Sequence, residues 1–68
     1  MDSKQILSRN LKKLIENAGI TQVELSEWSG INPNTINQYY NAHSLPNLDK
    51  ACKIARVFRI HAEDLLKE

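Results

Sequence analysis

The chain has 68 residues, enough for one small domain with a simple core, because so short a chain withdraws only about 60% of its unfolded surface from water. Nine Lys and Arg residues against eight Asp and Glu residues give a net charge of +1, which is a weak indication of a phosphate-bearing partner. No apolar run approaches the roughly 20 residues of a membrane-spanning helix, and Met1 to Lys4 lack the pattern of a secretion signal, so we expect a cytoplasmic protein with no membrane partner.

The N-terminal segment has the apolar spacing of an amphipathic helix. Its apolar positions follow an i, i+4, i+7, i+8 pattern and are Leu7, Leu11, Leu14, Ile15 and Ala18. Asp2 or Ser3 is expected to cap the start of this helix, and Gly19 is expected to end it in a left-handed conformation.

Two further helices follow from capping signals. Thr21 and Glu24 match a capping box, so a second helix begins here and ends before Gly30, which supplies the positive φ of a sharp exit. Asn32 is a good N-cap residue and Pro33 suits the first helical position, so a third helix follows and ends near residue 41 or 42. Two helices joined by so short a turn cross steeply, which is the geometry of a helix-turn-helix.

The remaining residues predict two more helices. Asn47 is the expected cap of a fourth helix. The apolar side of that helix is formed by Leu48, Ala51, Cys52, Ala55 and Phe58. After a brief break, residues 62–67 are expected to form a last short helix, and no strand candidate is recognisable. The sequence therefore predicts an all-α fold, a compact five-helix bundle in a single domain over residues 1–68, with a helix-turn-helix over about residues 21–41.

The predicted third helix separates into an apolar side and an amide side. At about 100° per residue, the apolar side holds Ile36, Tyr39 and Tyr40. The opposite side holds Asn34, Gln38 and Asn41, with Asn37 at its edge and Thr35 beyond. Each primary amide offers a donor and an acceptor in one plane, which matches the N6 and N7 atoms of adenine in the major groove. Any one of them is better explained as a solvated surface residue, but Asn is a poor helix former, so the set as a whole favours a function in base recognition.

A longer motif extends over most of the chain. It comprises Gly19-Ile20-Thr21-Gln22-Val23-Glu24-Leu25-Ser26, Gly30-Ile31-Asn32, Thr35-Ile36, Pro46-Asn47-Leu48, Ile54-Ala55 and Ile60-His61-Ala62-Glu63-Asp64-Leu65-Leu66. With this motif, residues 11–66 resemble the lambda-repressor-like helix-turn-helix family, which includes phage Cro and repressor domains and many bacterial regulators. The resemblance implies a phage or bacterial transcriptional regulator, most often a repressor, that binds a double-stranded DNA operator as a homodimer with its third helix in the major groove.

The resemblance also implies a role for individual residues. Base contacts are expected from Asn34 and Gln38, and further from Pro33, Thr35 and Asn37. DNA backbone contacts are expected from Gln22, Asn32, Asn41, His43, Ser44 and Lys12. Gln22 is expected both to brace the recognition helix and to touch a phosphate. The dimer interface is expected around Ile60, Leu65 and Leu66.

Several residues depart from the family pattern. Ile15 and Tyr40 stand where an arginine and a glutamate are common, so we expect an apolar contact between them in place of an ion pair. Ala42 and Arg59 occupy positions where glycine is common, and Ser26 replaces the usual alanine of the second helix.

Other reactive or bulky residues suggest no second chemistry. Trp28 is interpreted as filling the core, with a contact to a protein partner as the alternative. Cys52 lies on the apolar side of a helix as a small hydrophobe, and His43 and His61 fit no metal-ligand spacing. We therefore expect no enzymatic activity, metal, cofactor or small-molecule ligand. The alternative function is a protein-interaction module, such as an antitoxin-type regulator, whose main partner is another protein; the low net charge and Trp28 favour it slightly, and the amide side argues against it.

Overall fold

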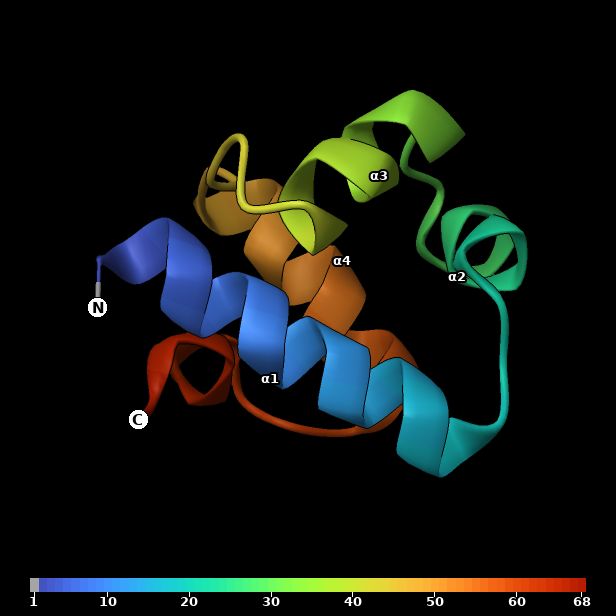
Figure 1. Ribbon diagram of the computed structural model, residues 1–68. Helices are drawn as coiled ribbons and strands as arrows, with labels where there is room; N and C mark the ends of the chain where they lie inside the picture. The colour runs from blue at the N-terminus through green and yellow to red at the C-terminus, as the bar shows by residue number, and fades with distance from the viewer. Residues whose placement is uncertain (1) are drawn as a thin grey trace.

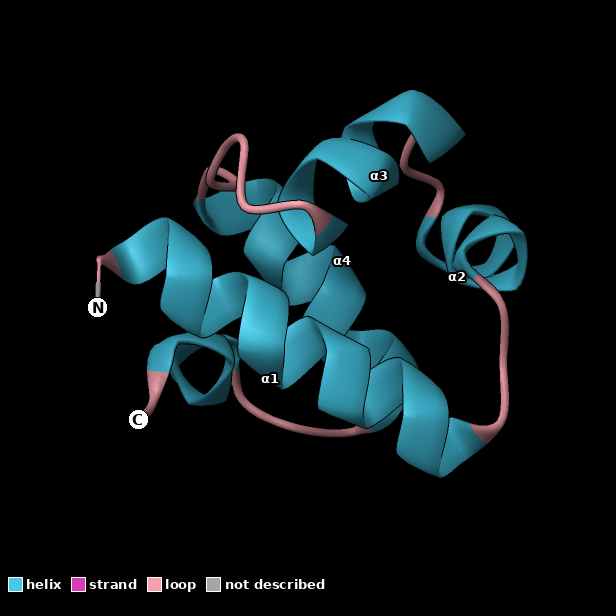
Figure 2. Cartoon of the chain, in the orientation of Figure 1, coloured by secondary structure: helices cyan, strands magenta, loops and turns pink. Residues whose placement is uncertain are grey.

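The fold is all-helical, as the sequence predicts. The computed structural model describes residues 2–68, which form four α-helices and one 3-10 helix. These are α1 (Ser3–Ala18), α2 (Gln22–Ser29), α3 (Pro33–Tyr40), α4 (Leu48–Phe58) and η1 (Ala62–Leu66). Figure 1 shows α2 and α3 on one side of α1 and η1 on the other, with α4 behind α1 in this view. Between residues 2 and 68 every segment is helix or loop, without a strand (Figure 2).

The last short helix expected over residues 62–67 is present as a 3-10 helix, Ala62–Leu66, so the bundle has four α-helices and the predicted count of five is wrong. The segment is a 3-10 helix of five residues, because so short a stretch cannot offset the cost of nucleating an α-helix, whereas i→i+3 bonds close a single tight turn. Asp64 holds that turn: it lies 2.8 Å from the Lys67 ammonium and accepts from the His61 N–H at 3.1 Å. The bond to Lys67, and to a smaller extent the bond from the His61 N–H, hold the pKa of the Asp64 carboxyl below its usual value.

The α-helices begin where the capping residues predict. Asp2 accepts from the Gln5 N–H at 2.9 Å, and Asn47 accepts from the Lys50 N–H at 2.8 Å. Thr21 and Glu24 exchange both bonds of a capping box, at 3.1 and 3.0 Å. Each side-chain cap satisfies a backbone donor that a helix leaves free, a contribution of about 1 kcal/mol.

Left-handed residues end α1, α2 and α4 and also follow α3. Gly19 and Gly30 have φ of 68° and 75°, as their positions predict. Ala42 and Arg59, which replace the glycines common in similar domains, also have positive φ, 62° and 58°. The loops therefore keep the backbone path that glycine would give, and two residues with a Cβ adopt it at a cost of about 1 kcal/mol each.

Ala42→Gly is therefore expected to stabilise the protein by up to about 1 kcal/mol, because glycine adopts φ near 60° without a steric penalty and loses part of that gain through its more flexible unfolded chain. Urea unfolding measures the change. Ala18→Gly is the matched control, since Ala18 is exposed and helical and its replacement should cost about 0.5 to 1 kcal/mol. Equal losses for both variants would contradict the left-handed conformation of residue 42.

One core joins all five helices. Its buried members are Leu7, Leu11, Ile15, Leu25, Ile31, Ile36, Tyr39, Ile54 and Leu65. Through this core α1 packs against α3 and η1, and α4 packs against α2 and η1. Ile36 is fully buried, and the Ser8 hydroxyl donates to the Tyr40 carbonyl at 2.5 Å, so both the rotation of α3 and its C-terminal end are fixed against α1.

The helix-turn-helix turn is closed from inside. The buried Ser26 hydroxyl donates to the Ile31 carbonyl across the turn at 2.5 Å, a bond that the alanine usual at this position could not make. Without it, that carbonyl would have to find another donor in a buried setting, at a cost of about 1 to 3 kcal/mol. Ser26 therefore fixes how α3 leaves α2.

Two hydrophobic side chains that the sequence analysis assigns to the apolar interior are exposed. The interpretation of Trp28 as a core residue is wrong: it is 58% exposed, because α2 packs inward through Leu25, Ser26 and Ser29. Leu48, expected on the apolar side of the fourth helix, is 76% exposed at the first position of α4. Both residues therefore lie at the surface and face solvent.

Tyr40 has a charged neighbour. The Lys12 ammonium lies 5.2 Å from the centre of the Tyr40 ring, within cation–π range. Ile15 is buried in the core and Tyr40 packs against that core, while the expected direct contact between the two stays a prediction.

Candidate DNA-binding surface

The outward side of α3 is built from amides. Asn34, Asn37, Gln38 and Asn41, here called the amide face, are all exposed. On the inward side Ile36 and Tyr39 are buried, and burial raises the pKa of the Tyr39 hydroxyl, which stays neutral. The apolar contacts of one side thus present the amides of the other to solvent on a short, rigid helix.

A row of hydrogen bonds connects the amide face to α2. The Asn37 Nδ2 group donates to Gln22 Oε1 at 3.2 Å, and the Asn41 Nδ2 group donates to Asn37 Oδ1 at 3.1 Å. Gln22, at the first position of α2, thereby braces α3 through Asn37. Because Gln22 accepts in this bond, both hydrogens of its Nε2 group remain for an external acceptor.

The amides on α3 differ in how far their side chains are hydrogen-bonded within the protein. The Asn37 amide donates to Gln22 and accepts from Asn41, so it helps to position both side chains, while its expected base contact stays a prediction. Within residues 2–68 the Asn34 side chain has no hydrogen-bond partner. Gln38 has only a long bond, 3.4 Å, from the Ser44 hydroxyl to its Oε1. Asn34 and Gln38 are therefore the two amides on α3 with a full edge available.

The start of α2 lies beside this row. Thr21 satisfies the Glu24 N–H, whereas the first backbone N–H groups of α2, those of Gln22 and Val23, have no acceptor inside the helix. The helix dipole adds partial positive charge at the same end. Together with the Gln22 amide, these donors fit one phosphate oxygen group.

The remaining residues that are expected to contact DNA lie on or next to α3. Pro33 and Asn32 are exposed at the N-terminus of α3, although Asn32 Oδ1 already accepts from the Asn34 N–H at 2.8 Å. Thr35 is half-buried on the flank of α3. His43 is exposed beyond the C-terminus of α3, where its backbone N–H donates to the backbone carbonyl of Gln38 at 2.8 Å.

The surface is short of positive charge, which whole-chain composition conceals. Residues 21–47 contain no Lys or Arg and two glutamates. The nearest cations along the chain are Lys13 and Lys50. Sequence reasoning missed this feature, although counting charge segment by segment reveals it. Within this segment, backbone and amide donors are the groups that can bind an anion, and Lys12 beside Tyr40 is a cation near the end of α3.

The three residues expected at a dimer interface do not share one environment. Leu65 is 1% exposed and belongs to the monomer core, so its side chain is not available to a second chain. Ile60 is half-buried, and Leu66 is exposed. Leu66 and Leu45 line the same small cavity, of about 80 Å³, and Leu45 is another exposed apolar residue that sequence reasoning missed.

Other kinds of site have little support in residues 2–68. They contain no group of three or more His, Cys, Asp or Glu side chains able to hold a metal ion. They also contain no helix long and apolar enough to cross a membrane. Cys52 is a half-buried free thiol on α4.

An all-helical bundle with a braced, amide-bearing second helix of a helix-turn-helix defines a DNA-binding domain of the transcription-regulator class. The helix-turn-helix family model matches residues 11–65, and the chain belongs to this family, which confirms the lambda-repressor-like resemblance. The chain is also similar to the solution structure of the SOS-response transcriptional repressor LexA from Eubacterium rectale, with 30% sequence identity and a TM-score of 0.90 over 97% of this chain and 70% of that one. No curated protein sequence matches it.

Proposed function

We propose that the protein represses transcription by binding operator DNA in a sequence-specific way, with α3 in the major groove. The carrying observation is the pair Asn34 and Gln38, which are exposed on a helix whose rotation is fixed by buried Ile36. Each carboxamide matches the N6 and N7 edge of adenine. Pro33 and Thr35 lie beside these two residues and would contact base edges or the thymine methyl.

Phosphate contacts in this proposal come from the edges of the site. One phosphate is held by Gln22 and the first N–H groups of α2. Further contacts to the DNA backbone, at the edges of the major groove, would come from Asn32, Asn41, His43 and Ser44. Lys12, held above the Tyr40 ring, is the flanking cation on α1. Occupying a promoter in this way, inside the cytoplasm, would block transcription.

Two copies are proposed to bind adjacent half-sites. A single α3 reads only a few base pairs, and pairing doubles the contact while fixing the spacing. The pairing surface would use Leu66 on η1 and Leu45, which line one small cavity, together with the half-buried Ile60 in the loop before η1. The interpretation as a protein-interaction module is favoured by one observation, the exposure of Trp28, which is compatible with DNA binding.

Selection from a random duplex pool tests this function. The expected product is a pair of half-sites that contain adenine and lie about 10 base pairs apart, the repeat of one helical turn. Affinity for the selected duplex should fall with salt, but with a slope of log K against log salt no steeper than about −3 per protomer, since residues 21–47 contain no Lys or Arg to displace counterions. A pool that enriches no sequence would contradict the proposal.

A further inference from the structure

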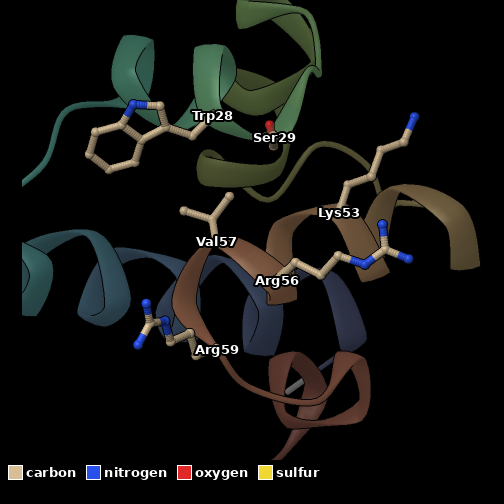
Figure 3. Close-up of a pocket in the computed structure, with 6 residues that line it drawn as sticks. All are labelled: Trp28, Ser29, Lys53, Arg56, Val57 and Arg59. Atoms are coloured by element: carbon tan, nitrogen blue, oxygen red, sulfur yellow. The ribbon is translucent and has the colours of Figure 1, made fainter.

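A second surface, on the α2–α4 side of the molecule, remains unexplained by DNA binding. Six residues line a groove of about 420 Å³, namely Trp28, Ser29, Lys53, Arg56, Val57 and Arg59. Figure 3 shows Trp28 on α2 facing Val57 on α4, with the Arg56 and Arg59 guanidinium groups on either side of Val57. None of these residues belongs to α3.

The groove combines apolar surface with concentrated positive charge. Lys53, Arg56 and Arg59 place three cations within seven residues of a chain whose net charge is +1, and no acidic residue lines the groove. Lys53 is paired with Asp49 at 3.2 Å. Arg56 and Arg59 are exposed and have no carboxylate within 4.0 Å in residues 2–68.

The backbone of Arg59 is in a conformation that is strained for a residue with a side chain. It ends α4 in the left-handed conformation, with φ of 58°, where glycine would fit without strain. A long cationic side chain here adds strain without filling the core. Strained backbone of this kind is concentrated at functional sites, and here it holds a guanidinium group in the lining of the groove.

We propose that this groove docks an acidic segment of another protein, one that carries an aromatic or aliphatic side chain among its carboxylates. The apolar side chain packs on Trp28 and Val57, and carboxylates form paired hydrogen bonds with the Arg56 and Arg59 guanidinium groups. Tryptophan and arginine are the residues that most often dominate protein interfaces. Because Trp28 lies at the end of α2 opposite Gln22, and no residue of the groove belongs to α3, DNA and the partner bind at the same time.

Nucleic acid fits the groove less well. A DNA duplex would offer phosphates to the arginines but little apolar surface to the indole, since its bases are stacked inside. A single-stranded nucleic acid would need successive aromatic platforms along a basic track, and this groove holds one aromatic residue.

Trp28 is the only tryptophan of the chain, so its fluorescence reports directly on the groove. The probe is a short synthetic peptide of Asp and Glu around one Phe, compared with the same peptide in which Asn and Gln replace the acids. The acidic peptide should shift and saturate the Trp28 emission, and the amide peptide should not. Equal binding of both peptides, or of neither, would overturn the proposal.

Two variants separate docking from stability. Arg59→Gly should weaken the acidic peptide about tenfold through loss of a charge-assisted pair, while unfolding at the same or a higher urea concentration because the strain at residue 59 is relieved. Arg56→Gln should weaken it by a similar factor, and Lys4→Gln, an exposed cation on α1, should not. Unchanged peptide binding in the Arg56 and Arg59 variants would overturn the proposal. So would a loss of duplex affinity in them equal to the loss for the peptide.

Discussion

Replacing Asn34 or Gln38 with alanine is expected to remove most of the preference for the selected operator while leaving folding stability unchanged. Each carboxamide that pairs with an adenine edge contributes about 1–3 kcal/mol of discrimination, a factor of roughly 5 to 150 in the ratio of specific to non-specific affinity. Both side chains are exposed and make no contact with the core, so the unfolding free energy should change by less than about 0.5 kcal/mol. Binding to the selected duplex and to a scrambled duplex, with urea unfolding alongside, measures both quantities.

The matched control is Asn17→Ala, which removes an exposed amide from α1 rather than from α3. It should leave both the specificity ratio and the stability unchanged. If Asn34→Ala and Gln38→Ala behave like Asn17→Ala, the amide face does not read bases. If they unfold the protein, the two side chains do not project into solvent.

Ile36→Ala is expected to produce the largest loss of stability of any single change on α3. Ile36 is 0% exposed, and shortening a buried isoleucine to alanine costs about 2–5 kcal/mol through lost transfer energy and the cavity left behind. A domain of this size has a total stability of about 3–10 kcal/mol, so the variant should be partly or wholly unfolded at room temperature. DNA binding should be lost with it, because the amide face exists only on a folded α3.

Ile36→Val provides a graded comparison, with an expected cost of about 0.5–1.5 kcal/mol and full specificity in the folded fraction. Val23→Ala, at an exposed position of α2, controls for the loss of an apolar side chain at the surface and should change little. Circular dichroism during urea unfolding gives the three stabilities. An Ile36→Ala protein as stable as the parent would show that α3 is not anchored by this residue.

Local features of the fold could be predicted because they depend on neighbours in sequence. The caps at Asp2, Thr21, Asn32 and Asn47 each need a backbone N–H only two or three residues away, so the residue type and its spacing suffice. The orientation of α3 could be predicted for a related reason, since Ile36 and the amides are separated by helical periodicity alone. Caps and helix periodicity can therefore be predicted without knowing where distant elements of the fold lie.

Features that depend on distant elements could not be predicted. The exposure of Trp28 follows from where α4 lies, which no local pattern fixes, and the burial of Leu65 follows from how η1 docks against α1. The bracing of α3 by Gln22 could be expected from the family resemblance alone, because its partner Asn37 lies 15 positions away. The groove beside Trp28 likewise forms only when α2 and α4 meet, so its three cations appear in the sequence as an ordinary solvated helix end.

The side-chain amide resonances of the ¹⁵N-labelled protein, followed as the selected duplex is added, test the central claim most directly. The NH₂ signals of Asn34 and Gln38 should shift more than any others, with a smaller change at Gln22, while the signal of Asn17 and the Trp28 indole stay in place. Shifts centred on Trp28 and the C-terminal end of α4, with Asn34 and Gln38 unmoved, would contradict the assignment of α3 as the helix that reads DNA.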